Sequence, residues 1–162
     1  MATDFRLANE AWEAYYRAQA AIARELTDAD IWGGLPTREY AVLYALSTEP
    51  AGLRITELGE DVLLTQPGMS RLCARLEARG LVERSDDADD ARAFRIRLTP
   101  EGTRAQRRVG LAVAQHVTDA MTRALSPEQI ETLRDLSVAL LAAAPGTAAA
   151  LQLKNLERTL SR

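Results

Sequence analysis

The chain has 162 residues, enough for one domain or for two small substructures that share a core. Charged residues make up 27% of the chain and the formal net charge is −3, so any affinity for DNA must come from a local group of arginines. Cys73 is the only cysteine and His116 the only histidine, which excludes an intramolecular disulfide and argues against a Cys/His zinc site. Nothing resembles a signal peptide, and no apolar run approaches the roughly 20 residues that span a bilayer. We therefore expect a cytoplasmic protein without a metal, a cofactor or a membrane partner.

The N-terminal part of the chain predicts two helices. The first has apolar side chains three and four residues apart, which places them on one stripe. Its members are Trp12, Tyr15, Tyr16, Ile22, Ala23 and Leu26. Thr3 or Asp4 can cap this helix. After a break at residues 33–36, Thr37 is a suitable N-cap for a second helix, which Pro50 ends.

The middle of the chain predicts two further helices, the second with two chemically different faces. Residues 53–55 can pair as an extra strand, and Thr56 is expected to cap a short helix after them. Thr65 caps the next helix, which has Pro67 in its first turn and Gly80 at its left-handed end. The apolar face of that helix carries Met69, Leu72, Cys73 and Leu76, and the polar face carries Gln66, Ser70, Arg71, Ala74 and Arg75.

A two-stranded hairpin is predicted to follow. Val82 and Arg84 begin one strand, and the return strand alternates at period two. We expect inward Phe94, Ile96 and Leu98 and outward Arg95 and Arg97. The loop between the strands is acidic, with Asp86, Asp87, Asp89 and Asp90. Because it lacks the glycine and terminal glutamate of a calcium loop, we interpret it as a solvated loop that faces away from DNA.

The C-terminal part predicts two long helices. Thr99 with Pro100 opens the first, and Ser126 with Gln129 forms a capping box at the start of the second, which Pro145 stops. From Thr147 onwards the pattern fits either a short extra helix or a frayed end. The terminal helices are longer and more apolar than a small DNA-reading unit requires, so we expect a second copy to cover them.

These elements predict a mainly α fold. A winged helix-turn-helix with a small β-hairpin wing would occupy residues 33–99. The terminal helices, over residues 1–32 and 100–162, would form a dimerisation region. Two copies related by a two-fold axis would present two reading helices about one helical turn apart on a pseudo-palindromic duplex.

The motifs in this order resemble the MarR (multiple antibiotic resistance regulator) family of transcription factors over roughly residues 8–144. The similar parts are residues 64–72 and 76–84, the wing pattern Asp90-x-Arg92, then Leu98-Thr99 and Glu101-Gly102. The resemblance implies an obligate homodimer that represses, or less often activates, nearby genes. It also implies loss of DNA affinity when a small anionic aromatic compound or an oxidant binds. The recognition helix of the family maps onto residues 66–79, and its minor-groove wing arginine onto Arg92.

Several polar residues are candidates for DNA contact. Arginine forks onto guanine or pairs with phosphate, short polar groups suit base edges, and a helix N-terminus attracts a phosphate. An arginine at a hairpin tip fits a narrow minor groove. The candidates are Thr65, Gln66, Ser70, Arg71, Arg75, Arg92 and Arg95. The alternative for each arginine is an ordinary solvated side chain. Asp90 is expected to hold the wing in shape by pairing with an arginine or capping loop amides.

An effector site and two alternative functions remain open at this point. Aromatic residues near the N-terminus either pack in the core or line a pocket for a phenolic or carboxylate compound, with Arg17, Arg38 or His116 as anion partners. The pocket candidates are Trp12, Tyr16, Tyr40, Tyr44 and His116. Cys73 is either a buried structural thiol or a redox switch. A helical dimeric adaptor that contacts protein is the other alternative. An enzyme is not expected, because one histidine supports no nucleophile–base–orienter set.

Overall fold

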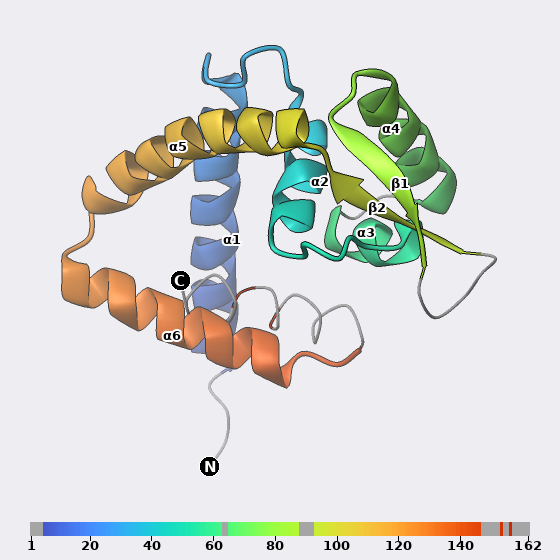
Figure 1. Ribbon diagram of the computed structural model, residues 1–162. Helices are drawn as coiled ribbons and strands as arrows, with labels where there is room; N and C mark the ends of the chain where they lie inside the picture. Colours follow the sequence, from blue (N-terminus) through green and yellow to red (C-terminus); the bar gives the residue numbers. More distant parts are fainter. Residues whose placement is uncertain (1–4, 63–64, 88–92, 147–152, 154–155, 157–162) are drawn as a thin grey trace.

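The computed structural model describes residues 5–62, 65–87, 93–146, 153 and 156, in six helices and one hairpin (Figure 1). In chain order the elements are α1 (Phe5–Asp28), α2 (Thr37–Ser47), α3 (Ile55–Val62), α4 (Gln66–Ala78), β1 (Val82–Asp86), β2 (Phe94–Leu98), α5 (Pro100–Thr122) and α6 (Pro127–Ala143). The predicted mainly α fold with a hairpin wing is therefore confirmed. None of the described helices is long and apolar enough to span a membrane. In the predicted C-terminal tail, Leu153 and Leu156 are helical and the other residues lie outside the described part.

The buried core lies within the helix-turn-helix and its immediate supports. It extends from Leu35 to Val109 and is built mainly from α2, α4, the hairpin and the first half of α5. By contrast, α1 and α6 bury no residue completely. Figure 1 shows α6 at the opposite end of the molecule from α4 and the hairpin.

The terminal helices expose large apolar side chains. Trp12 on α1 is 62% exposed, Leu111 on α5 is 76% exposed and Leu140 on α6 is 65% exposed. Burying apolar surface contributes about 25 cal/mol per Å², so a chain gains stability by covering such side chains. The part of the protein predicted to mediate dimerisation is thus the part left uncovered in the single chain.

The hairpin is antiparallel, with Val82 opposite Leu98 and Asp86 opposite Phe94. The extra strand predicted at residues 53–55 is reduced to one bridge. The Leu53 N–H donates to the carbonyl of Ile96 at 2.9 Å, and the Ile96 N–H donates back at 2.8 Å. The pairing stops there because Ile55 already begins α3.

Two predicted helix caps are wrong by one or two residues. Helix α2 begins at Thr37 itself, so that Pro36 is its N-cap. Helix α3 begins before Thr56, and the carboxylate of Glu57 accepts the backbone N–H of Arg54 at 2.7 Å. The predicted capping box of α6 is present, and Thr65 is the N-cap of α4, although its side chain makes no capping hydrogen bond. Thr3 and Asp4, proposed as caps of the first helix, lie outside the described residues.

The end of α4 is joined to the start of α5 by close backbone contacts. Gly80 adopts the predicted left-handed conformation with φ of 68°, and its carbonyl accepts the Thr99 hydroxyl at 2.6 Å. The same hydroxyl oxygen accepts the backbone N–H of Gly102 at 3.0 Å, which caps α5. A Cβ on Gly102 would lie 1.8 Å from the carbonyl oxygen of Leu81. Only glycine fits at this position.

We expect Gly102→Ala to destabilise the protein by about 2–3 kcal/mol, toward the upper end of the usual cost of overpacking, because the obstructing atom is backbone. Urea unfolding followed by circular dichroism measures this change. Gly110→Ala, on the same helix, is the matched control. An added Cβ there meets only the ends of Gln106 and Tyr40 at 3.3 and 3.4 Å, so its effect should stay within about 1 kcal/mol of zero. Equal effects of the two changes would contradict the close approach.

Candidate nucleic-acid interface

Helix α4 has one buried and one exposed face, as the sequence predicted. Met69, Leu72, Cys73 and Leu76 are buried against the core. Five of the seven residues proposed to contact DNA lie on this segment, and all five are exposed: Thr65, Gln66, Ser70, Arg71 and Arg75. Within the described residues, Arg71 forms no ion pair, so its guanidinium is open to an external partner.

A buried carboxylate that the sequence did not single out lies beneath this helix. Glu39 on α2 is only 5% exposed. One of its oxygens lies 2.5 Å from Nη1 of Arg79, and the other lies 3.5 Å from Nε of Arg75. Arg79 also donates to the carbonyl of Gly34 at 3.4 Å. In the sequence, Glu39 looks like an ordinary acidic residue in a first helical turn, so nothing there indicates these long-range partners.

Of the acidic residues predicted to be solvated, Asp86 is exposed but Asp87 is not. Asp87 is buried, not solvated, and its Oδ2 lies 2.7 Å from Nε of Arg54 and 3.0 Å from Nε of Arg95. Arg95, predicted to point outward toward DNA, therefore has its guanidinium bound to Asp87 and donates to the carbonyl of Gly52 at 3.1 Å. A period-two pattern describes the two faces of a strand but contains no information on such tertiary partners. Asp89, Asp90 and Arg92 lie outside the described residues.

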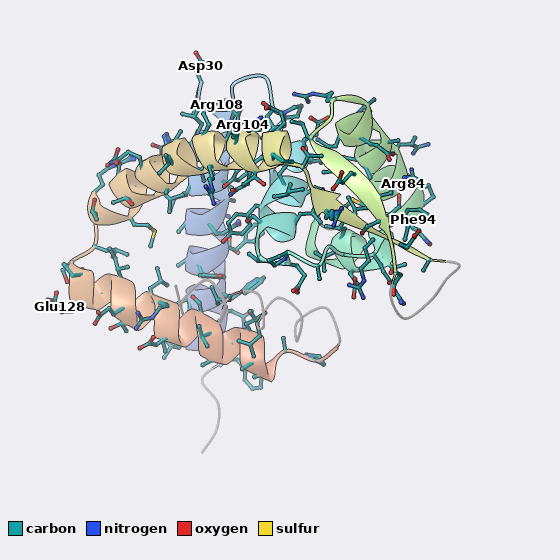
Figure 2. All side chains as sticks on the ribbon, in the orientation of Figure 1. Asp30, Arg84, Phe94, Arg104, Arg108 and Glu128 are labelled. Carbon is teal, nitrogen blue, oxygen red and sulfur yellow. The ribbon has the colours of Figure 1, made fainter. Side chains whose placement is uncertain are left out.

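Phe94 was predicted to be buried, but it is exposed near the end of the hairpin. The guanidinium of Arg84 lies 4.5 Å from the centroid of its ring, as Figure 2 illustrates. The Nε of Arg84 also lies 3.1 Å from the carboxylate of Glu77 on α4. An exposed cation–π contact contributes about 0.5–1 kcal/mol. Arg84 thus connects the hairpin to the C-terminal part of α4.

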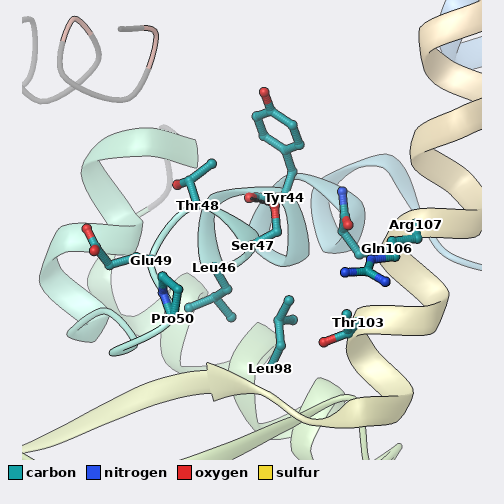
Figure 3. Close-up of a pocket in the computed structure, with 10 residues that line it drawn as sticks. All are labelled: Tyr44, Leu46, Ser47, Thr48, Glu49, Pro50, Leu98, Thr103, Gln106 and Arg107. Carbon is teal, nitrogen blue, oxygen red and sulfur yellow. Dashed lines mark hydrogen bonds between the residues drawn. The ribbon is translucent and has the colours of Figure 1, made fainter. Parts of the chain in front are cut away.

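A cleft of about 590 Å³ lies between α2 and α5 (Figure 3). Its α2 side includes Tyr44 and Thr48, and its α5 side includes Thr103, Gln106 and Arg107. The cleft therefore combines an aromatic ring, several hydrogen-bonding groups, the cation of Arg107 and the carboxylate of Glu49. An aromatic ring with a few polar groups is typical of a site for a small polar aromatic compound.

Of the residues predicted to form an effector pocket, only Tyr44 lines this cleft. Tyr40 packs between Trp32 and Tyr44, with ring centroids 5.7 and 6.1 Å away, and burial raises the pKa of its hydroxyl. The other candidates do not meet there. Trp12 and Tyr16 stack on each other on exposed α1, and His116 lies between α5 and α1, 3.7 Å from Glu25. Gln106 and Arg107 were not among the predicted pocket residues, because polar residues on a long helix look solvated in the sequence.

The Cys73 thiol is buried, and burial raises its pKa from 9.0 to about 11. Because the thiolate is the reactive form, we expect the native thiol to react with a disulfide reagent about 100-fold more slowly than a free cysteine at pH 8. Absorbance of the released thiolate measures the rate. The same chain unfolded in urea is the control and should react at the free-cysteine rate. Equal reaction rates of Cys73 in the native and the unfolded chain would instead support the redox interpretation.

Comparison with known proteins agrees with this geometry. A family model described as the MarR family matches residues 33–93. Transcriptional regulator HosA of Escherichia coli O127:H6 is 32% identical over 98 residues, which cover 60% of this chain and 71% of HosA. The chain belongs to the MarR family. It is a DNA-binding transcriptional regulator with a winged helix, and the curated relatives that it matches are named as transcriptional regulators.

Two solved MarR-family structures are similar over most of their length. Sco3205 from Streptomyces coelicolor, in complex with DNA, has a TM-score of 0.69 and 28% identity, and the match covers 85% of this chain and 88% of Sco3205. The Mycobacterium tuberculosis protein Rv2887, in complex with salicylic acid, has a TM-score of 0.62 and 28% identity, with 76% and 91% covered.

Proposed function

We propose that this MarR-family protein places α4 in the major groove of an operator duplex. The observation that carries this proposal is the exposed polar face of α4 opposite a fully buried apolar face. Gln66, Ser70, Arg71 and Arg75 would face base edges and phosphates, and Thr65 would lie beside a phosphate at the helix N-terminus. Sco3205, a relative in complex with DNA, supports this assignment.

The wing completes the proposed interface. Arg92 would enter the adjacent minor groove, and Asp90 would shape the loop that carries it. Arg95 would act indirectly through the shape of the wing, since its guanidinium is bound to Asp87. A protein bound at the operator would block transcription, so we propose that it is a repressor. We propose that it acts in the cytoplasm.

We further propose that the protein acts as a homodimer through residues 1–32 and 100–162, with residues 33–99 as the DNA-binding unit. The exposed apolar side chains of α1, α5 and α6 support this division. A two-fold dimer would place its recognition helices about 34 Å apart, which matches one turn of duplex.

We expect Leu136→Glu combined with Leu140→Glu to weaken dimerisation by about 30-fold or more, because two exposed leucines one turn apart on α6 would then bring charges into a covered surface. Sedimentation velocity over a micromolar concentration series measures this effect. Arg134→Glu is the matched control, since it makes the same change in net charge on a different face of α6. Monomeric wild-type protein at these concentrations would contradict the dimer.

A small phenolic or carboxylate effector is proposed to occupy the cleft between α2 and α5. Tyr44 would stack on the ring, and Arg107 with Gln106 would bind the anionic group. The complex of Rv2887 with salicylic acid supports this class of ligand. The raised pKa of Cys73 favours this effector over a thiol switch.

Selection from a randomised duplex library at physiological salt tests the proposed function. Enrichment of an inverted repeat with half-sites about one helical turn apart is expected. No enrichment by a folded dimer, both alone and with a panel of aromatic carboxylates, would overturn the proposal. The chain would then be tested as a dimeric adaptor that contacts protein.

A further inference from the structure

The pairing of Glu39 with two arginines gives these arginines different tasks. A buried carboxylate is costly unless it is paired and hydrogen-bonded, so Glu39 needs cationic partners. Arg79 lies just beyond the last residue of α4, and it also donates to the carbonyl of Gly34. Arg79 is therefore a tether between the end of the recognition helix and the segment that precedes α2.

Arg75 is held differently. Its side chain is 59% exposed, and its closest approach to Glu39 is from the inner nitrogen, Nε, at 3.5 Å. Among the described residues, Glu39 is its one ion-pair partner. A guanidinium whose Nε is turned toward a carboxylate keeps its two terminal nitrogens at the far edge, and this edge is the fork that matches O6 and N7 of guanine.

Space for an approaching base edge exists at this place. A groove of about 750 Å³ lies between the N-terminal turn of α2 and α4, and both Glu39 and Arg75 line it. Arg71 lines the same groove one helical turn away and forms no ion pair within the described residues. Arg71 thus keeps the rotamer freedom that suits a phosphate contact, whereas Nε of Arg75 lies within ion-pair distance of Glu39.

We propose that Glu39 is a positioning residue for sequence readout: it restrains Nε of Arg75 so that the terminal guanidinium edge meets a guanine in each half-site. This inference rests on the proposed binding of duplex by α4. It assigns base recognition to Arg75 and backbone attachment to Arg71, and it makes a residue outside the recognition helix a determinant of specificity.

The test measures how tightly the full chain binds two duplexes of equal length, one enriched by selection and one of random sequence. The measured quantity is the affinity for the selected duplex divided by the affinity for the random duplex. We expect Glu39→Gln to lower this ratio about 10-fold while affinity for the random duplex stays equal or rises, since a negative charge is removed. Glu101→Gln is the matched control: it removes one carboxylate from an exposed pair with Arg104 on α5 and should leave the ratio unchanged.

A double-mutant cycle shows whether Glu39 acts through Arg75. In an Arg75→Ala background, Glu39→Gln should change the ratio by less than about 2-fold, because the side chain that it positions is gone. A full 10-fold loss in that background would overturn the inference, and so would an unchanged ratio in Glu39→Gln alone. If the wild-type chain binds both duplexes equally well, the proposed function is wrong, and so is the inference that rests on it. If the wild-type chain prefers the selected duplex and Glu39→Gln keeps that preference, only the inference is wrong.

A measurement on the wild-type protein tests the inference even if the Glu39 variant does not fold. The Nε–H signals of Arg75 and Arg71 are assigned in NMR spectra from the lysine variants of each. We expect the Arg75 signal to exchange with solvent at least about 10-fold more slowly than the Arg71 signal if the carboxylate of Glu39 restrains it as proposed. Equal exchange rates would overturn the restraint on which the inference depends.

Discussion

Arg71→Ala combined with Arg75→Ala is expected to reduce affinity for the selected duplex by about 100-fold or more. Each arginine that contacts a base or a phosphate contributes about 1–3 kcal/mol, and both lie exposed on the outer face of α4. The dependence of the logarithm of affinity on the logarithm of salt concentration should become shallower by about 1, because Arg71 is assigned to a phosphate. Fluorescence anisotropy titrations at several salt concentrations measure both quantities.

The matched control for this double variant is Arg104→Ala with Arg134→Ala. It removes the same two charges, but from exposed pairs with Glu101 on α5 and Asp135 on α6. It should leave duplex affinity within about 3-fold of wild type, since distant charges act only through a screened field. Equal losses in the two double variants would mean that net charge drives binding. Wild-type affinity in Arg71→Ala with Arg75→Ala would contradict α4 as the reading helix.

Asp87→Ala is expected to destabilise the fold by about 2–3 kcal/mol. Removing one partner of a fully buried ion pair costs about 3–5 kcal/mol, because the other charge is left unpaired. Here the side chains of Arg54 and Arg95 are 38% and 23% exposed, so water compensates part of that loss. Urea unfolding followed by circular dichroism measures the free energy of unfolding. Specific duplex binding should weaken as well, because the wing loses its connection to the residues before α3.

The adjacent aspartate supplies the control. Asp86 has the same side chain but is exposed on β1, so Asp86→Ala should change the free energy of unfolding by less than about 0.5 kcal/mol. If the two aspartates gave the same small effect, the buried pairing of Asp87 would not exist in solution.

Local features of the chain were predictable from its sequence. The buried face of α4 followed from apolar residues at helical spacing, and the end of that helix followed from Gly80. The Ser126 capping box and the Thr99 cap were predictable for the same reason, since each depends on residues within three positions. The order of the motifs along the chain also indicated the MarR family.

The parts that could not be predicted depend on contacts between distant residues. Asp87 meets Arg54 across 33 positions, and Glu39 meets Arg79 across 40, so neither pairing leaves a periodic trace. Phe94 follows the strand alternation correctly but lies where the hairpin extends past the core, a limit set by the tertiary fold. The aromatic residues proposed for an effector pocket cluster in sequence on α1 and α2, but in the single chain only Tyr44 of them lines the cleft between α2 and α5.

The backbone contacts among Gly80, Thr99 and Gly102 join α5 rigidly to the end of α4. At 1.5 Å per residue, this 23-residue helix is about 34 Å long, so a tilt of about 5° displaces one end by about 3 Å relative to the other. The backbone of Gly102 packs directly against the carbonyl of Leu81, which follows α4 in the chain. We therefore expect a tilt of α5 to move the end of α4 with it. If the proposed effector occupies the cleft between α2 and α5, a tilt of a few degrees would be enough to shift α4 relative to the proposed operator duplex.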